Sequence, residues 1–332
     1  MSLFDPTVTL SWDKLSTELP QKRKHAQAVV HNDKVYVGSG YCERDELSHE
    51  IAAFCLKTNK WEQLPRSETR WFAMAIFENE LVLISGKYEN GASCKKVAKF
   101  KDEDKMWTWP ADIMEMTKAR MGASATSITA HLLVAGGWDD MKNRVNTVEV
   151  YDKHKRQWFK GQSLPKLAAE CKTALVDNDS WVFLGGANQY RAVFYASIQA
   201  IIKQAVPTII EESKEEEFNQ DGAKEGESRE NTAVEENAKQ VWISLPDTQN
   251  EFSCAAVLGG SLVSIGGSGL MRNSKAIYAY ISHTNSWLRI GEKPEEICRA
   301  VAVTLNNGSI LVLGGVDKNK GLLSTVYKCS LR

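Results

Sequence analysis

The stretch LLVAGG, residues 132–137, is followed by the segment YDKHKRQW, residues 151–158. A short apolar run thus ends in a glycine doublet that closes at Gly137. Tyr151 stands 14 residues after that glycine, and Trp158 stands seven residues after Tyr151. This order of apolar run, small residues and spaced aromatic side chains recurs along the 332-residue chain, so we first ask whether the chain is built from repeats.

Six apolar runs of the same kind can be aligned on their closing glycines. The intervals between successive closing glycines are 46, 51, 49, 81 and 48 residues, so four of the five lie near 50. Self-similarity at such a period is typical of solenoids, propellers and other repeat arrays. The closing glycines are Gly40, Gly86, Gly137, Gly186, Gly267 and Gly315.

The aromatic residues repeat at the same intervals as the glycines. Fourteen residues after the first two closing glycines stand Phe54 and Phe100, and Trp61 and Trp107 follow seven residues later. The fifth repeat supplies Tyr280 and Trp287 at offsets of 13 and 7. A glycine doublet, a spaced Tyr or Phe and then a Trp resemble the kelch repeat, and the segments at 54–61 and 151–158 are most similar to the metazoan kelch-like subfamily.

Each repeat also predicts four strands. A further apolar run precedes each glycine run, and short turn-forming pairs such as Asn32-Asp33 and Asn307-Gly308 separate the two, as in a two-residue hairpin. A third strand carries the Tyr or Phe and a fourth carries the Trp. Four antiparallel strands per repeat make one propeller blade. We therefore expect an all-β fold, a six-bladed kelch β-propeller, with the large aromatic side chains filling the space between blades.

Two departures from the repeat predict how the ring closes and where it is interrupted. The last repeat ends at Arg332 before any Trp, whereas the N-terminal segment VTLSW supplies Trp12. We expect this N-terminal strand to complete the sixth blade, which removes the open edges of the ring. In the fourth repeat, Tyr195 is followed by Trp242 only after 47 residues. An insertion therefore lies between the third and fourth strands of that blade.

The insertion, residues 199–240, has the composition of a disordered segment. Between Glu211 and Lys239 there are 11 acidic and 4 basic residues, and Phe218 is the one aromatic residue. Such a segment buries too little apolar surface to offset its chain entropy. Without it, the net charge of −1 becomes +6. We predict a single propeller domain over residues 1–332 that carries this acidic, disordered insertion.

Composition excludes several classes of protein. The balanced charge argues against a nucleic-acid-binding domain, which is usually strongly basic. The chain has no stretch of about 18 apolar residues and no signal-peptide pattern at its start, so we expect no membrane segment and a cytoplasmic location. The seven cysteines are scattered without a C-x-x-C pair, which favours a reducing compartment.

The sequence predicts neither an enzyme nor a cofactor. The six histidines show no metal-ligand spacing, and neither a phosphate-binding glycine loop nor a nucleophile elbow is present. The stretch ERDELSHE, residues 43–50, contains acids and a histidine without the spacing seen in the iron sites of plant specifier proteins. We expect no catalytic residue, no metal and no cofactor. An enzyme on a kelch propeller remains the second alternative.

Charged residues are predicted at one mouth of the central channel. Sixteen residues before the closing glycines, or seventeen in the third blade, the chain enters each innermost strand with a charged residue. We expect a ring in which a basic arc faces Glu170 and Glu251. The basic arc consists of Lys24, Arg70, Arg120 and Arg299.

The loops after the glycines are expected on the same face as the charged ring. Tyr, Trp and Arg are the residues that most often anchor protein interfaces. In kelch-like adaptors, which this chain resembles, that face binds peptides through inner-strand arginines and loop aromatics. The loops supply Tyr41, Tyr88, Trp138, Tyr190 and Arg272 as further partner-binding candidates.

These observations predict a protein-interaction module, a monomeric propeller whose partner is a protein or peptide with an acidic segment. The resemblance to kelch-like substrate adaptors suggests a component of a ubiquitin ligase. The repeats occupy essentially the whole sequence outside the insertion, leaving no residues for the BTB and BACK domains of those adaptors, so another protein would have to supply recruitment. An actin-binding or cytoskeletal kelch protein is the first alternative, because the fold alone does not identify the partner.

Overall fold

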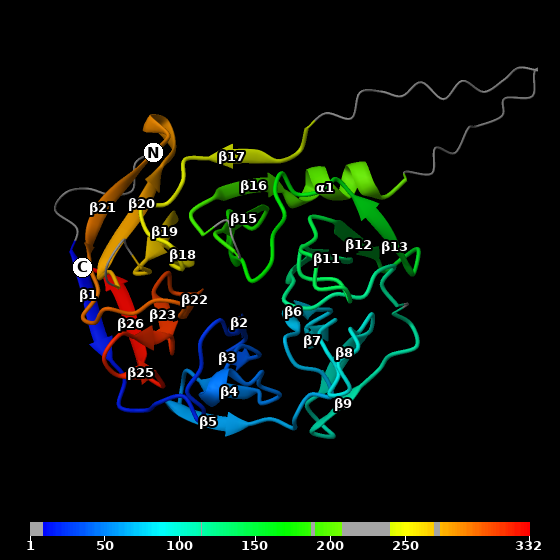
Figure 1. The fold of residues 1–332 in the computed structure, drawn as a ribbon, viewed down its shortest axis with the longest axis horizontal. Helices are drawn as coiled ribbons and strands as arrows, with labels where there is room; N and C mark the ends of the chain where they lie inside the picture. Colours follow the sequence, from blue (N-terminus) through cyan, green and yellow to red (C-terminus); the bar gives the residue numbers. More distant parts are fainter. Residues whose placement is uncertain (1–8, 114, 187–189, 208–239, 269–272) are drawn as a thin grey trace, which may run out of the picture.

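Six four-stranded antiparallel sheets are arranged in a ring around a central axis (Figure 1). The computed structural model describes residues 9–113, 115–186, 190–207, 240–268 and 273–332. In each of the first five blades the strands follow one another from the innermost to the outermost position. The predicted fold class, a six-bladed propeller with four antiparallel strands per blade, is confirmed.

The first three blades have short, regular strands. Blade 1 contains β2 (Gln27–His31), β3 (Lys34–Gly38), β4 (Ala52–Cys55) and β5 (Lys60–Gln63). Blade 2 contains β6 (Ala73–Phe77), β7 (Glu80–Ile84), β8 (Val97–Lys101) and β9 (Met106–Thr108). Blade 3 contains β10 (Ser124–Ile128), β11 (His131–Ala135), β12 (Val148–Asp152) and β13 (Gln157–Gly161).

The other three blades depart more from one another. Blade 4 contains β14 (Lys172–Val176), β15 (Ser180–Leu184), β16 (Val193–Ser197) and β17 (Ile243–Leu245). Blade 5 contains β18 (Cys254–Leu258), β19 (Ser261–Ile265), β20 (Ala276–Ile281) and β21 (Ser286–Glu292). Blade 6 contains β22 (Val301–Thr304), β23 (Ile310–Leu313), β26 (Val326–Leu331) and β1 (Leu10–Lys14). The small hairpin of β24 (Val316–Asp317) and β25 (Gly321–Leu322) follows β23.

The N-terminal strand closes the ring, as predicted. Strand β1 pairs antiparallel with the C-terminal strand β26, so that Trp12 lies opposite Cys329. The ring of Trp12 meets that of Tyr327 edge to face, with centroids 6.3 Å apart. The first and last segments of the chain therefore share one sheet, and opening the ring requires loss of this pairing.

The spaced aromatic residues pack between blades. Tyr151 and Trp158 are cross-strand partners whose ring centroids are 5.4 Å apart, and they join a buried cluster with Phe77 and Val82 of blade 2. The corresponding pair in blade 1, Phe54 with Trp61, is also in cross-strand register. Because each pair fills the space against the preceding blade, the sequence repeat directly specifies the contacts that build the ring.

In the fourth blade, the aromatic residue predicted from the repeat faces the other way. Ala196, rather than Tyr195, lies opposite the second-strand residue Trp181, at the position that Tyr151 occupies in blade 3. Trp181 and Trp242 fill the core of this blade in place of a tyrosine. Tyr195 instead lines a cavity of about 450 Å³ between blades 4 and 5. A one-residue shift in a strand moves a side chain to the opposite face of the sheet.

The predicted insertion is flanked by the two strands expected. Strands β16 and β17 pair antiparallel as the third and fourth strands of blade 4, and Trp242 precedes β17. The insertion does not begin as a disordered segment, because helix α1 (Ile198–Ala205) follows β16 directly, capped at Ser197. Ile198, Ile201 and Ile202 on one face of this helix are buried. Residues 208–239, to which the prediction of disorder mainly applies, lie outside the described residues.

Closing glycines are required where the chain leaves the second strand. Gly137 has φ +100°, and a Cβ at this position would lie 2.8 Å from the backbone oxygen of Met121. The contact joins the exit of the second strand to the entry of the first, and no side chain fits between them. The same geometry occurs at Gly86, whose Cβ would lie 2.8 Å from the oxygen of Arg70. The glycine doublet therefore fixes the geometry of the channel mouth.

Candidate functional site at the channel mouth

Six residues, one from each blade, enter the innermost strands with left-handed backbone geometry. Backbone hydrogen bonds link many of them to the neighbouring blade: His25 N–H donates to Arg299 O at 2.9 Å, and Gly122 N–H donates to Trp71 O at 2.8 Å. Left-handed geometry is costly for bulky residues and is kept where the surrounding structure enforces it. We call these six residues the inner ring. They are His25, Trp71, Gly122, Glu170, Phe252 and Arg299, with φ between 53° and 62°.

The inner ring corrects the predicted ring of charges. Of the predicted residues, Glu170 and Arg299 belong to it, whereas Lys24, Arg70 and Glu251 lie one position earlier. Those three pair through backbone bridges with the residue after the closing glycine of their own blade: Tyr41, Lys87 and Ser268. The connection between the inner-ring residue and the closing glycine differs in length among blades, so a fixed count from the glycines does not select equivalent positions.

Arg120 is not a surface residue of the mouth. Its side chain is only 1% exposed, and Nη1 donates to the carbonyl oxygens of Gly136 and Thr147 at 3.1 and 3.0 Å. Nη2 forms a buried ion pair with Glu149. Burial lowers the pKa of Arg120, and Glu149 opposes this shift. Arg120 therefore holds the strands of blade 3 together, which corrects the prediction that it contacts a partner.

The equivalent position in blade 1 shows that this role depends on position in the repeat. Arg23 is likewise buried, and its Nη1 donates to the carbonyl oxygens of Ser39 and Glu50 at 3.2 and 3.1 Å. In blade 5, the amide of Asn250 donates to Gly266 O at 3.0 Å. At this position of the repeat, a buried side-chain donor bonds the carbonyl oxygen of the residue before the closing glycine. The side chain therefore stabilises the fold and is not available to a partner.

Three aromatic side chains form a strip across blades 1 to 3. Tyr41 and Trp71 have ring centroids 5.6 Å apart, and Trp71 and Trp138 have centroids 6.3 Å apart. Gly122 makes room for them, because a Cβ there would lie 3.0 Å from Trp71 Nε1 and 3.3 Å from Trp138 Cδ1. All three side chains are partly exposed. We call Tyr41, Trp71 and Trp138 the aromatic strip.

A second aromatic group lies across the mouth, on blades 4 to 6. The rings of Tyr190 and Phe252 have centroids 4.3 Å apart, and the guanidinium of Arg299 lies 4.3 Å from the centroid of Phe252. A cation over an aromatic face is attracted by the negative potential of the ring. The stacking fixes the plane of the Arg299 guanidinium at the mouth.

The mouth is spanned by contacts between opposite blades. Tyr41 of blade 1 donates its hydroxyl to Oε1 of Glu170 of blade 4 at 3.0 Å, and Lys172 Nζ donates to Ala26 O at 3.1 Å. The cavity beside them, lined by inner-ring residues, has a volume of about 20 Å³, room for about one water molecule. The channel is therefore closed at this level.

Burial shifts the pKa values of the groups at this closure. It raises the pKa of Glu170, opposed by the Tyr41 hydrogen bond and by the charges of Lys172, Arg299 and Lys24. Burial and the same three cations lower the pKa of His25. His25 is therefore neutral at neutral pH, and its 3.9 Å approach to Glu170 is not an ion pair. Burial also lowers the pKa of Lys172 to about 8.

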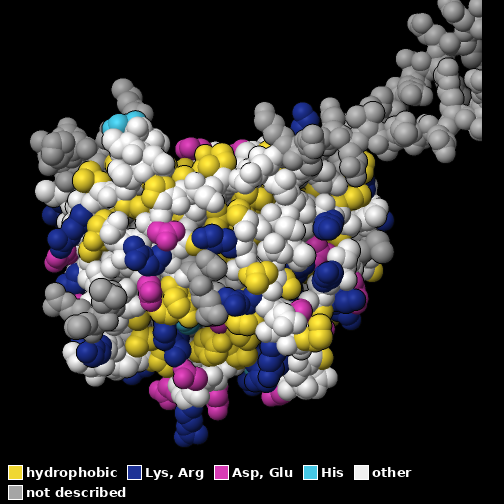
Figure 2. Space-filling view, turned by 45° about the horizontal axis from the view of Figure 1, so that its top comes forward, with side chains coloured by type: hydrophobic (Ala, Val, Ile, Leu, Met, Phe, Trp, Pro, Cys, Tyr) yellow, Lys and Arg dark blue, Asp and Glu magenta, His cyan; other side chains and the backbone are white. Residues whose placement is uncertain are grey.

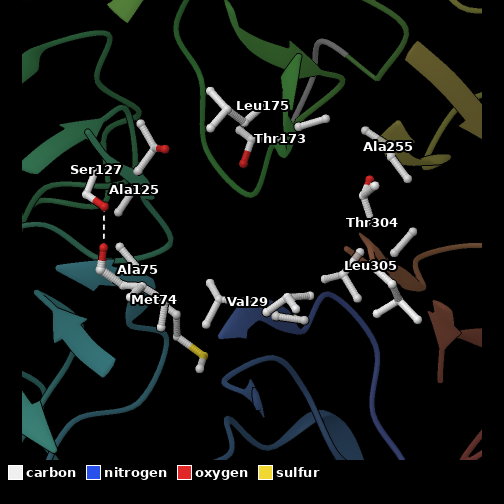
Figure 3. A pocket seen from close by; sticks show the side chains of 18 of the residues that line it. Val29, Met74, Ala75, Ala125, Ser127, Thr173, Leu175, Ala255, Thr304 and Leu305 are labelled. Atoms are coloured by element: carbon white, nitrogen blue, oxygen red, sulfur yellow. Dashed lines mark hydrogen bonds between the residues drawn. The ribbon is translucent and has the colours of Figure 1, made fainter. Parts of the chain in front are cut away.

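The opposite half of the channel is wide and uncharged. A cavity of about 500 Å³ opens there, lined by alanine, valine and other small residues of the innermost strands (Figure 3). Two of its hydroxyl groups bond neighbouring blades: Ser127 donates to Ile76 O, and Thr304 donates to Val257 O at 3.0 Å. None of the lining residues carries a charge. Within the channel, charged side chains therefore line the mouth and not this wider half.

The cations of the mouth differ in whether their charged groups already have ion-pair partners within the protein. Lys24 forms an ion pair with Asp45 at 2.5 Å. Among the residues that the structure describes, neither Arg70 nor Arg299 forms an ion pair, and the Nε atom of each is buried without a hydrogen-bond partner. The guanidinium of Arg299 stacks on Phe252. Basic and acidic side chains are interspersed over the surface in Figure 2. The electrostatic potential of the whole surface is therefore mixed in sign, and recognition of an acidic partner depends on local groups such as these two guanidiniums.

The remaining predicted residues divide into two kinds. Tyr88 is bonded within its own loop, with Cys94 Sγ donating to its hydroxyl at 3.1 Å. Arg272 lies outside the described residues.

Sequence reasoning missed His25, Trp71 and Phe252, although each immediately follows a residue that it selected. Selecting the histidine or aromatic residue at the entry of each innermost strand, instead of the charged residue before it, would have found them.

Two further searches were made over the described part of the chain. There, no group of three or more His, Cys, Asp or Glu side chains could hold a metal ion. Within the same ranges, no helix is long and apolar enough to cross a membrane.

Comparisons with known proteins support the repeat. The family model described as "Kelch motif" matches residues 119–165, which contain blade 3. Alpha-scruin of Limulus polyphemus is 23% identical over 206 residues, covering 57% of this chain and 22% of that protein. Kelch-like protein 38 of Rattus norvegicus is 25% identical over 183 residues, covering 54% of this chain and 31% of that protein.

The chain therefore spans about a fifth to a third of the length of these curated relatives. The solved structure titled "Structure of YjhT" superimposes with a TM-score of 0.69 at 15% identity and covers 95% of this chain and 99% of that one. At this identity, the likeness shows the shared fold alone.

Proposed function

Because the chain is a kelch-repeat β-propeller, we propose that it is a protein-interaction module that binds an acidic peptide segment at the channel mouth. The observation that carries the proposal is that the buried Nε atoms of Arg70 and Arg299 have no hydrogen-bond partner, and that neither guanidinium forms an ion pair with a carboxylate among the described residues. Arginine forms paired hydrogen bonds with carboxylates, and its planar fork is pre-organised for them.

The aromatic strip supports contact with a protein chain. Tyr41, Trp71 and Trp138 are partly exposed and are held in place by mutual packing. Rigid aromatic side chains and arginine are the usual energetic anchors of protein interfaces. An acidic segment with apolar or aromatic residues beside its carboxylates fits this combination.

Binding is favoured over catalysis by the size of the enclosed space. The cavity lined by Glu170, Lys172 and Arg299 has a volume of only about 20 Å³, well below the several hundred Å³ of a typical small-molecule site. A peptide that lies over the mouth requires no such cavity. Substrate recognition for a ubiquitin ligase is one form of this proposal, as the resemblance of the repeats to kelch-like substrate adaptors suggests.

A tetramethylrhodamine-labelled octaglutamate peptide tests the proposal, with octaglutamine as its neutral counterpart. Fluorescence anisotropy should show that the chain binds octaglutamate and not octaglutamine. Arg70→Ala and Arg299→Ala should each weaken binding by about tenfold. The control is Arg289→Ala, which removes an exposed arginine of the outer strand β21. Equal effects of all three substitutions, or equal binding of both peptides, would contradict a specific acidic site at the mouth.

An actin-binding role is the second candidate, and the similarity to alpha-scruin favours it. Co-sedimentation with actin filaments tests it directly. If the chain pellets with filaments, the Arg70→Ala and Arg299→Ala variants show whether the mouth makes the contact. Absence of the chain from the pellet at micromolar filament concentrations would reject this candidate.

A further inference from the structure

We propose that Glu170 determines the specificity of the mouth, because its carboxylate competes with the carboxylates of an acidic partner for the cations there. This inference rests on the proposed function and identifies the residue that limits it.

Glu170 already occupies the position that an incoming carboxylate would seek. Its side chain is 15% exposed, and Oε1 accepts the hydrogen bond from Tyr41 at 3.0 Å. Oε2 lies 3.9 Å from Nδ1 of His25, which has no hydrogen-bond partner among the described residues. One oxygen of this carboxylate thus accepts a hydrogen bond from blade 1, and the other faces the imidazole of His25 from the same blade.

Three cations from three blades act on this carboxylate. They are Lys24 of blade 1, Lys172 of blade 4 and Arg299 of blade 6, and each favours its charged form; Lys172 and Arg299 also line the same small cavity as Glu170. The groups that face Glu170 also include His25 and Tyr41, and Asp45 is the acid that pairs with Lys24. Glu170 therefore neutralises part of the positive charge that would attract a partner.

A second carboxylate entering the mouth would meet the charge of Glu170. Like charges within about 4–6 Å disfavour each other, and the effect is stronger in a partly desolvated site. An acidic partner must either bind Arg70, which is not among the groups that act on Glu170, or displace Glu170 from Tyr41. In both cases, Glu170 lowers the affinity for acidic segments and selects those that meet this geometry.

A purely structural role for Glu170 can be separated from this one. Its hydrogen bond with Tyr41 ties blade 1 to blade 4 across the channel. Glu170→Gln removes the charge but keeps an oxygen that can accept from the Tyr41 hydroxyl. If Glu170 has only a structural role, this substitution should not tighten the binding of acidic ligands. If Glu170 competes with the ligand for the cations, the substitution should tighten it.

The test measures octaglutamate binding by anisotropy for the wild-type, Glu170→Gln and Asp33→Asn chains. Asp33→Asn is the matched control, because it removes one negative charge from the far-face hairpin, where Asp33 pairs with Lys57 at 2.5 Å. We expect Glu170→Gln to bind about tenfold more tightly than wild type and Asp33→Asn to stay within about twofold of it. Octaglutamine binding should not change.

The possible failures are distinguishable. If the wild-type chain binds octaglutamate, Arg299→Ala weakens binding and Glu170→Gln binds no more tightly than wild type, the competition is wrong and the proposed function stands. An equal gain in Asp33→Asn would also overturn it, since the effect would then be one of net charge. If neither the wild-type nor the Glu170→Gln chain binds, the proposed acidic site itself is wrong.

Discussion

The hydroxyl of Tyr41 and the carboxylate of Glu170 lie 3.0 Å apart, although the two residues are 129 positions apart in the chain and come from opposite blades. Their hydrogen bond crosses the mouth beside the contact between Lys172 and Ala26. The channel is thus narrow at the mouth, where charged side chains line it, and wider in the half with the uncharged lining. A partner at the charged end binds over this closure and not through the channel.

The buried carboxylate predicts a pH-dependent difference in stability. Burial raises the pKa of Glu170, so folding favours its protonated form, and this contribution is present at low pH and lost as the pH rises through the folded pKa. Relative to the Glu170→Gln variant, the wild-type chain should therefore lose stability as the pH rises above about 4.5, the ordinary pKa of a glutamate, and through the higher folded pKa. Urea unfolding of both chains across this range measures the difference, and a difference independent of pH would contradict the assignment.

The buried arginine of blade 3 should be far more important for stability than its predicted counterpart at the mouth. Arg120→Ala leaves Glu149 without its ion-pair partner and frees two carbonyl groups, which should cost about 3–5 kcal/mol. Arg70→Ala should change stability by less than about 0.5 kcal/mol, because the side chain of Arg70 forms no ion pair with a described residue and its backbone pairing with Lys87 is kept. Chemical denaturation of both variants provides the comparison. Similar losses of stability in the two variants would contradict the buried, structural role of Arg120.

A closing glycine should resist even the smallest side chain. Gly137→Ala places a Cβ 2.8 Å from Met121 O at φ +100°, which adds a steric clash to the backbone strain. The control is Gly308→Ala in a far-face turn, where φ is +78° and no atom lies within 4 Å of the Cβ. Gly137→Ala should cost at least about 1 kcal/mol more than Gly308→Ala. Equal thermal stabilities would show that the close approach at the mouth is not required.

Closure by the N-terminal strand predicts a large effect of Trp12. This side chain packs on Tyr327 and against the buried cluster shared by blades 5 and 6. Trp12→Ala should cost about 3 kcal/mol and lower the melting temperature of the whole propeller in one transition. Asp13→Ala, an exposed neighbour on the same strand, is the control and should be nearly neutral. A stable Trp12→Ala chain would mean that the ring closes without this strand.

Much of the fold could be predicted because the repeat encodes it locally. Each closing glycine is required by a positive φ, and each aromatic pair, such as Tyr151 with Trp158, is required by packing between blades. These local requirements recur from blade to blade and are therefore visible as a repeat in the sequence. The fourth blade shows where this reasoning ends. Tyr195 stands nine residues after Gly186 instead of fourteen, and the strand register places Ala196 at the aromatic position while Trp181 fills the core.

The candidate site was harder to predict, because it depends on single-residue differences among loops. Arg70 and Arg120 look equivalent by their distance from the glycines, yet one is partly exposed and the other is 1% exposed. The contact between Tyr41 and Glu170 joins two loops that no repeat pattern relates. Which charges meet across the mouth is decided by the closed ring and not by any one blade.

The most direct measurement of the central claim locates the bound peptide. An octaglutamate peptide carrying a benzophenone at one end is photo-cross-linked to the chain, and the modified residues are identified by mass spectrometry. A site at the mouth predicts cross-links on the aromatic strip and the inner ring, competed by unlabelled octaglutamate and reduced in Arg299→Ala. Cross-links concentrated on the far-face hairpins or on the outer strands, unaffected by that substitution, would contradict the account.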